Sequence, residues 1–303
     1  MKIDNIRVSE HIKITLYAFL RKTHLIRRKK FIKKYEKYFS RIKEEWVRNI
    51  PHRSINIESK SLRAATRGTI GILTSPYTEF IAHCVSDVLN SLNIRTKIFF
   101  DYEANDDDDM FYIVIAPVYF SILPKNYFAF NVEQCVVDRW FTKDYFDKLN
   151  NAYGVLDYSL TNIEFLNRHN VTPGKLFYTK LFPRPLKILD FDSKTTPILF
   201  YGSLNQKRKE ILERLSQKFP IKIVENAFHE EMHHELDKAK IVLNIHFYEN
   251  ALLETTRLCE AMSHGCLVIS ERGSNNEEYP ELEELVDFVD VDDVDALERS
   301  IQF

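Results

Sequence analysis

The chain has 303 residues, of which 45% are hydrophobic and 13% aromatic, so it can bury one large core or two ordinary ones. That composition excludes a wholly disordered protein. The formal net charge of -2 hides an asymmetry, because residues 1–65 carry +12 and the remainder carries -14. The two regions therefore meet different partners or surfaces.

Membrane-spanning and secreted classes find no support in the sequence. It contains no run of 18 apolar residues, and its first residues lack an apolar stretch followed by a small-residue cleavage site. The four cysteines, Cys84, Cys135, Cys259 and Cys266, lack metal-binding spacing and are expected to be buried thiols. We expect a cytoplasmic protein that can touch the inner face of a membrane.

Residues 1–65 are predicted to form a basic helical extension. An apolar stripe from Phe31 through Tyr35 to Trp46 follows helical spacing, and lysines and arginines crowd the other positions. Such helices can pack on the main body with a solvated basic face. Alternatively, residues 12–48 can lie on an anionic membrane, whereas nucleic acid is the least favoured partner.

Residues 66–190 are predicted to form a first α/β domain with a parallel sheet, because apolar strand-like runs alternate with helical patterns. Ligands bind at the carboxyl ends of such strands. Three carboxylates follow strand ends and are catalytic candidates: Glu79, Glu133 and Asp157. Helix capping or a buried hydrogen-bond network would also explain each of them. The expected strands cover residues 69–73, 96–100, 110–116, 127–131 and 154–158.

Two patterns invite a metal interpretation, and neither is favoured. Asp106 to Asp109 form an acidic run, but the run precedes a strand and is typical of a solvated loop. His229 and His233 share a helix face and match H-E-x-x-H, yet the surrounding helix is polar almost throughout. We expect no metal.

Residues 191–303 are predicted to form a second α/β domain. A strand at 197–201 leads through Gly202 and Ser203 into a helix from about residue 206. A glycine turn into a helix N-terminus is a ready anion site, and Arg208 is the first candidate to contact a phosphate there, with Arg257 second. Asn244, His246 and Tyr248 follow a strand ending at residue 244 and are expected to face the same crevice, where loop packing is the alternative role.

The segment from 241 to 271 reads as strand, loop, helix, glycine turn and strand, with the helix expected over residues 251–262. Its Arg257-x-x-Glu260-Ala261 pattern resembles the nucleotide-sugar half of GT-B glycosyltransferases of the family 1 and family 4 type. The resemblance implies that Glu260 holds the donor ribose hydroxyls. Many retaining members carry a second glutamate eight positions earlier, where this chain has Leu252. Glu249 and Glu254 flank that gap, and Glu254 is included among the donor-binding candidates.

The resemblance implies a GT-B fold, with two Rossmann-like parallel-sheet domains facing a cleft and the basic helical extension in front. Residues 131–134 and 152–162 are also similar to bacterial cell-surface polysaccharide transferases. The implied reaction moves a sugar from a nucleotide-diphosphate donor to a saccharide or lipid-linked acceptor, without metal or other cofactor and with inversion favoured. The alternative is a non-catalytic GT-B-like protein that docks a partner or nucleic acid through its basic helices.

Overall fold

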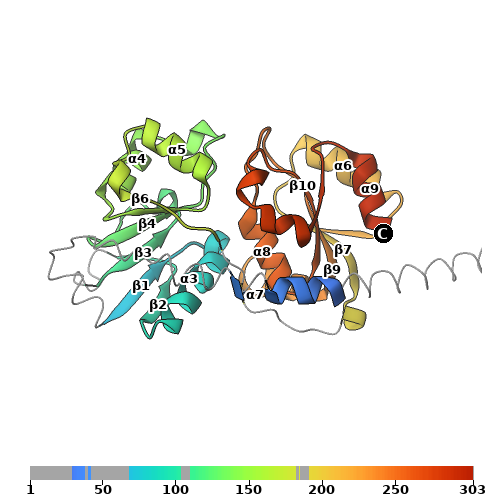
Figure 1. Ribbon diagram of the computed structural model, residues 1–303, viewed down its shortest axis with the longest axis horizontal. Helices are drawn as coiled ribbons and strands as arrows, with labels where there is room; N and C mark the ends of the chain where they lie inside the picture. Colours follow the sequence, from blue (N-terminus) through green and yellow to red (C-terminus); the bar gives the residue numbers. More distant parts are fainter. Residues whose placement is uncertain are drawn as a thin grey trace, which may run out of the picture.

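The computed structural model describes residues 29–37, 40–41, 68–103, 110–181, 184 and 191–302. It contains two parallel sheets, which form two lobes side by side in Figure 1. Helices α3 and α8 face each other where the lobes meet. Among the described residues, no helix is long and apolar enough to cross a membrane.

The first sheet has six parallel strands in the order β2-β1-β3-β4-β5-β6. Its central strand β3 is buried along its whole length, as expected for a continuous apolar run between two helical layers. The strands are β1 (Thr69–Leu73), β2 (Arg95–Phe99), β3 (Tyr112–Ile115), β4 (Tyr127–Asn131), β5 (Val155–Asp157) and β6 (Leu176–Tyr178). The helices are α3 (Glu79–Ser91), α4 (Lys143–Asn151) and α5 (Leu160–Arg168).

The second sheet has five parallel strands in the order β11-β10-β9-β7-β8. The strands are β7 (Thr196–Tyr201), β8 (Ile221–Val224), β9 (Ala239–Asn244), β10 (Leu267–Glu271) and β11 (Val286–Val289). The helices are α6 (Gln206–Ser216), α7 (His229–Lys238), α8 (Thr255–Ser263) and α9 (Val294–Gln302). The predicted domain boundary at 190/191 lies between β6 and β7 and stays a prediction.

Short 3-10 helices lie between the strands and helices. They are η1 (Pro76–Thr78), η2 (Pro117–Tyr119), η3 (Asp138–Trp140), η4 (Pro173–Lys175), η5 (Phe191–Ser193), η6 (Asn276–Glu278) and η7 (Pro280–Glu284). η1, η2 and η3 come after β1, β3 and β4, so they lie at the carboxyl edge of the first sheet.

The expectation of a doubly wound α/β fold is confirmed, and two details of it are wrong. The helix expected from residue 251 begins at Thr255, because residues 251–254 form a loop that hydrogen-bonds elsewhere. The backbone N–H of Leu252 donates to Gln134 in the first domain, and that of Leu253 donates to Asn275. The short strand β6 was not predicted, because three residues give too little periodicity to recognise.

Residues 29–37 of the basic extension form a helix that lies beside α8 in Figure 1. Phe31 and Tyr35 are buried, as the apolar stripe predicts. The Tyr35 hydroxyl donates to the carbonyl of Arg184 at 2.7 Å and lies 3.1 Å from the hydroxyl of Ser263 in α8. The rest of the predicted stripe and most of residues 12–48 lie outside the described residues.

Candidate active site between the two domains

A cavity of about 240 Å³ lies between the two domains. The first domain contributes Tyr77 and Glu79 from the segment after β1. The second contributes Gly202, directly after β7, and Arg257 and Glu260 from α8. This is the edge of a parallel α/β sheet where ligands are expected. The remaining lining residues are Pro76, Phe80, Tyr201, Ser203, Val224, Asn226, Ala227, Phe228, His229, Met232 and His233.

Gly202 allows the turn that forms one wall of the cavity. Its φ of 119° lies in a region that residues with a Cβ rarely adopt. A Cβ there would also lie 2.9 Å from a guanidinium nitrogen of Arg257. The glycine thus lets the backbone after β7 approach the Arg257 side chain closely.

Glu260 presents its carboxyl group to the cavity from α8. The Tyr201 hydroxyl donates to its Oε2 at 3.3 Å. Burial raises the pKa of Glu260 to about 7, although Tyr201 and Arg257 act in the opposite direction. A carboxylate in this place can accept two hydrogen bonds from a vicinal diol.

Arg257 is held in place by two neighbours. One of its guanidinium nitrogens lies 3.3 Å from Asn244 Oδ1 and 3.3 Å from Glu254 Oε2. Its guanidinium also lies over the Tyr201 ring, 5.0 Å from the centroid. Asn244 is fully buried and does not line the cavity, so its part in the site is to position Arg257.

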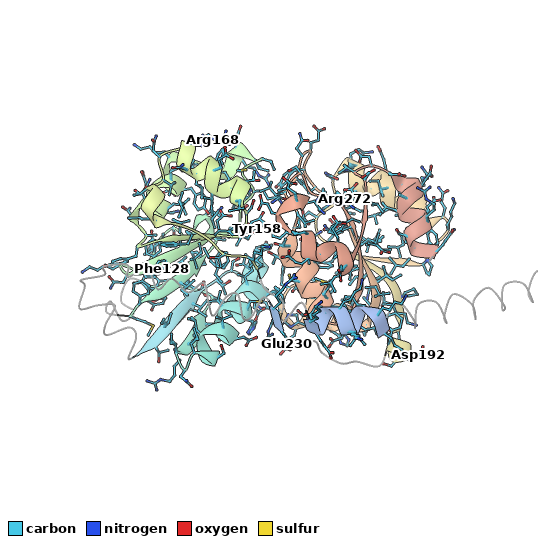
Figure 2. The ribbon with its side chains drawn as sticks, viewed as in Figure 1. Phe128, Tyr158, Arg168, Asp192, Glu230 and Arg272 are labelled. Carbon is cyan, nitrogen blue, oxygen red and sulfur yellow. The ribbon has the colours of Figure 1, made fainter. Side chains whose placement is uncertain are left out.

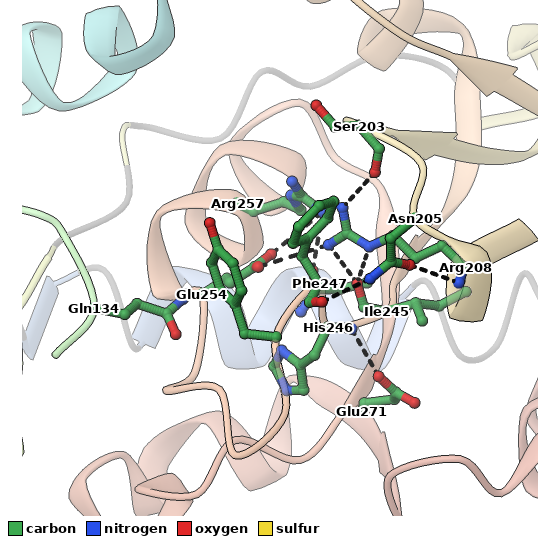
Figure 3. A network of polar contacts seen from close by, with 12 residues as sticks. Gln134, Ser203, Asn205, Arg208, Ile245, His246, Phe247, Glu254, Arg257 and Glu271 are labelled. Carbon is green, nitrogen blue, oxygen red and sulfur yellow. Dashed lines mark hydrogen bonds and ion pairs between the residues drawn. The ribbon is translucent and has the colours of Figure 1, made fainter. Parts of the chain in front are cut away.

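Arg208 is turned away from the cavity, which corrects the expectation that it is the first phosphate contact. Figure 3 shows its guanidinium donating to the backbone carbonyls of Ile245 and Ser203. It is 2% exposed, and burial lowers its pKa to about 10. Because its donors are used on backbone groups, Arg208 braces the two loops behind the cavity wall, and Arg257 is the cation at the surface.

Glu254 lies between the two arginines at the N-terminus of α8 (Figure 3). Its carboxylate oxygens are 3.3 Å from Arg257 and 3.7 Å from Arg208. Burial alone would raise the pKa of Glu254, but the two guanidinium groups hold it below the usual value. Glu254 therefore supplies the negative charge beside Arg257.

His246 and Tyr248 follow β9 and point to different places. The His246 ring is 1% exposed, and burial lowers its pKa, so the imidazole is neutral. Its backbone N–H donates to Glu271 at 2.7 Å, and the residue does not line the cavity. Tyr248 instead reaches the first domain, where its hydroxyl accepts a hydrogen bond of 2.7 Å from Arg139.

Glu79 lines the cavity, as a candidate base should. Its two carboxylate oxygens contact His229 of α7 and, at 3.4 Å, His83 of its own helix. The Glu79–His229 pair joins the two domains across the cavity.

Asp157 is the last residue of β5, Glu133 lies just beyond the end of the neighbouring strand β4, and the two have different surroundings. Burial raises the pKa of Glu133, although a hydrogen bond with Tyr119 and the charge of Arg139 lower it. Asp157 is fully buried, and its oxygens accept hydrogen bonds from Ser159, Asn162 and Asn131. We therefore correct the expectation that Asp157 is a catalytic candidate, because its carboxyl group is buried in this network and does not line the cavity.

The cavity also includes residues that the sequence did not single out, among them Tyr77, Asn226 and Phe228. His229 attracted notice only as a possible zinc ligand. The signal that could have found Tyr77 is its position directly after the first strand, at the edge where ligands bind. His229 and Phe228 follow β8 in the same way.

Metal-binding clusters are absent from the part of the chain that the structure describes: no three His, Cys, Asp or Glu residues there could hold an ion. The acidic run Asp106 to Asp109 lies outside the described residues.

The comparison with known families concerns the second domain. Residues 188–303 match a family model described as glycosyl transferase-like. No curated protein sequence matches the chain significantly.

Solved structures give distant likenesses. HepE of Anabaena, in complex with UDP and glucose, is 11% identical with a TM-score of 0.48, over 78% of this chain and 89% of that one. Sucrose-phosphate synthase of Thermosynechococcus elongatus is 13% identical with a TM-score of 0.47, over 78% and 89%. WaaG, a glycosyltransferase involved in lipopolysaccharide biosynthesis, is 8% identical with a TM-score of 0.46, over 77% and 90%.

Two parallel α/β domains enclose the cavity, and the second domain is glycosyl transferase-like. The likeness to glycosyl transferases is thus a property of residues 188–303, which form the second wall of the cavity.

Proposed function

We propose that this protein transfers a sugar from a nucleotide-diphosphate sugar to a hydroxyl acceptor. The observation that carries the proposal is the pairing of Glu260 and Arg257 on one cavity wall beside the Gly202 turn. The carboxylate suits the ribose diol, and the guanidinium suits the diphosphate. The match of the second domain to a glycosyl transferase-like family model supports the same reaction.

The leaving diphosphate is stabilised electrostatically in this proposal. The proposal puts the diphosphate beside Arg257, which lines the cavity, so that its guanidinium meets the negative charge that grows as the bond to the sugar breaks. The reaction therefore proceeds without a metal ion. The acceptor hydroxyl loses its proton to a carboxylate of the first domain, and Glu133 and Glu79 are the candidates. Such a base implies inversion at the anomeric carbon.

The acceptor we propose is a surface glycan or a lipid-linked saccharide, reached by a protein that works at the inner face of a membrane. The helix at residues 29–37 buries Phe31 and Tyr35 against the body of the protein. Its exposed side carries four lysines: Lys29, Lys30, Lys33 and Lys37. A basic face directed to solvent is attracted to anionic lipid.

Glu260→Gln tests the donor site. One nucleoside diphosphate from a panel of five bases should raise the melting temperature of the wild-type protein, since ligand binding stabilises the folded state. The variant should bind that nucleotide about 10 to 100 times more weakly, because hydrogen bonds to a charged group contribute about 1.5 to 3 kcal/mol. Calorimetric titration measures both affinities.

The 2′,3′-dideoxy form of the same nucleotide is the matched control ligand. It should bind wild type and variant equally, because the diol that Glu260 holds is missing. Glu164→Gln, on the exposed face of α5, is the control variant. Unchanged affinity of Glu260→Gln for the full nucleotide would refute the assignment and favour a non-catalytic binding protein.

A further inference from the structure

A continuous series of aromatic rings leads out of the cavity along the domain boundary. Phe228 and Tyr77, which line the cavity, meet edge to face with centroids 4.6 Å apart. Tyr77 stacks with Tyr119 at 6.0 Å, and Tyr119 meets the Trp140 ring at 6.0 Å. We call Tyr77, Tyr119, Trp140 and Tyr248 the aromatic strip.

The far end of the strip joins the two domains. The Arg139 guanidinium lies over the Trp140 ring at 4.5 Å and donates to the Tyr248 hydroxyl at 2.7 Å. Tyr248 belongs to the second domain, so the strip is completed only when the domains meet.

The strip is placed where a substrate would pass. Tyr77, Tyr119 and Trp140 lie on η1, η2 and η3, which all follow strands of the first sheet at its carboxyl edge. Tyr77 is 68% exposed and Tyr119 42% exposed. Single exposed aromatics are ordinary on protein surfaces, but neighbouring ones that continue a cavity mark an interaction site.

The chemistry around the rings fits a saccharide. Sugar rings offer apolar C–H faces that pack on aromatic rings, while their hydroxyls at the edge need hydrogen-bond partners. Tyrosine and tryptophan combine an apolar face with a polar group in this way. Arg139 supplies further N–H donors, and Glu133, which hydrogen-bonds with Tyr119, supplies acceptors.

We propose that the aromatic strip is the acceptor subsite, that the acceptor is a saccharide stacked on Tyr119 and Trp140, and that Glu133 is the base. This inference rests on the proposed sugar transfer. The Glu133 carboxylate takes the proton of the acceptor hydroxyl as that oxygen bonds to the anomeric carbon of the donor. The bond from this carbon to the diphosphate oxygen breaks, and its electron pair leaves with the diphosphate.

Trp140 allows a direct test, because the chain has only two tryptophans, Trp46 and Trp140. In a Trp46→Phe variant, Trp140 is the only tryptophan, so the tryptophan fluorescence reports on this position alone. Neutral tetrasaccharides and uronate-containing tetrasaccharides are titrated in the absence of donor. At least one should change the fluorescence saturably. Tyr119→Ala should weaken that binding about tenfold, which corresponds to about 1.4 kcal/mol for the loss of one stacked ring.

Tyr153→Ala is the matched control, because Tyr153 is 37% exposed on the same domain and lies outside the strip. It should bind the saccharide like the parent. Nucleoside-diphosphate affinity is measured on the same samples and should be equal in parent, Tyr119→Ala and Tyr153→Ala.

Three outcomes would overturn the acceptor subsite. They are the absence of a response to any tetrasaccharide, a response that Tyr119→Ala leaves unchanged, and a response to an oligonucleotide alone. If nucleoside diphosphate still binds in these cases, the strip proposal fails by itself. If saccharide binds and no nucleotide does, the proposed sugar transfer fails instead.

Discussion

At the scale of single residues, the polar groups that end β4 and β5 form one buried network. Asp157 accepts hydrogen bonds from Asn131 at 2.6 Å and Asn162 at 3.1 Å, and the Tyr145 hydroxyl donates to Asn131 at 2.6 Å. Buried polar groups are almost always paired in this way. The network fixes the strand ends beside Glu133, whose carbonyl accepts from Asn131 and Asn162.

Asp157 should make the stability of this protein depend on pH. Burial raises its pKa from 3.8 to about 7, so between these values the folded protein keeps a proton that the unfolded chain releases. The contribution of this group to the free energy of unfolding therefore falls as pH rises through that window. From pH 5 to pH 8 the fall should be about 2 to 3 kcal/mol.

Urea unfolding of wild type and Asp157→Asn at pH 5 and pH 8 measures this effect. The variant lacks the titrating group, so its stability should decline less over the interval, whatever its stability at pH 5. Equal declines in the two proteins would show that Asp157 does not hold a proton at neutral pH.

At the scale of elements, α5 is capped from both domains. Ser159 accepts a hydrogen bond from the backbone N–H of Asn162, as the sequence pattern predicts. Glu278, on η6 of the second domain, accepts from the backbone N–H groups of Leu160 and Thr161 at 2.8 and 3.0 Å. A carboxylate at a helix N-terminus is favoured by the unpaired N–H groups and the helix dipole. Nearby, Figure 2 places Tyr158 at the domain boundary, where its carbonyl accepts from Tyr279.

Glu278→Gln should loosen the contact between the two domains. The amide keeps the shape but loses the charge, which should cost about 1 to 2 kcal/mol of interdomain contact. We expect a larger radius of gyration in X-ray solution scattering. Glu277→Gln, exposed one residue earlier, should scatter like wild type. If the two variants scatter alike, Glu278 does not hold the domains together.

At the scale of the whole molecule, the basic helix lies beside the junction of the two domains. Tyr35 contacts Ser263 of α8, and Lys34 forms an exposed ion pair with Glu284. The helix thus presents lysines on the outside of a body whose remaining sequence is acidic. The proposed membrane docking predicts that this lysine face turns toward an anionic surface.

Replacement of Lys29, Lys30, Lys33 and Lys37 by glutamine should weaken binding to vesicles that contain phosphatidylserine. Each lysine near such a surface contributes about 1 kcal/mol, so the loss should be on the order of a hundredfold or more. Sedimentation with vesicles measures it, and neutral phosphatidylcholine vesicles and Arg168→Gln are the controls. Arg168 lies on α5, away from the domain boundary (Figure 2). Equal binding by wild type and the fourfold variant would contradict membrane docking through this helix.

Many of the strands and helices can be predicted from the local pattern of apolar and polar residues. The run at 127–131 has the bounds predicted for it, because aromatic and other apolar residues between polar turns form a buried strand. The helix around Glu260 was recognised from spacing, and its first turn was misplaced. Contacts of Leu252 and Leu253 with distant Gln134 and Asn275 keep that stretch extended, and no local pattern encodes such partners.

The sequence by itself determined the two α/β units, the glycine turn and the Arg257–Glu260 helix, because periodicity and turn chemistry act within a few residues. Only the tertiary structure decided which charges face the cavity. Arg208 and Arg257 both carry a guanidinium group near the predicted site. The Arg208 guanidinium donates its hydrogen bonds to the backbone carbonyls of Ile245 and Ser203, whereas Arg257 lines the cavity. Which arginine faces the cavity depends on where loops distant in sequence place their backbone carbonyl oxygens. The chain topology and the burial of these loops fix those positions.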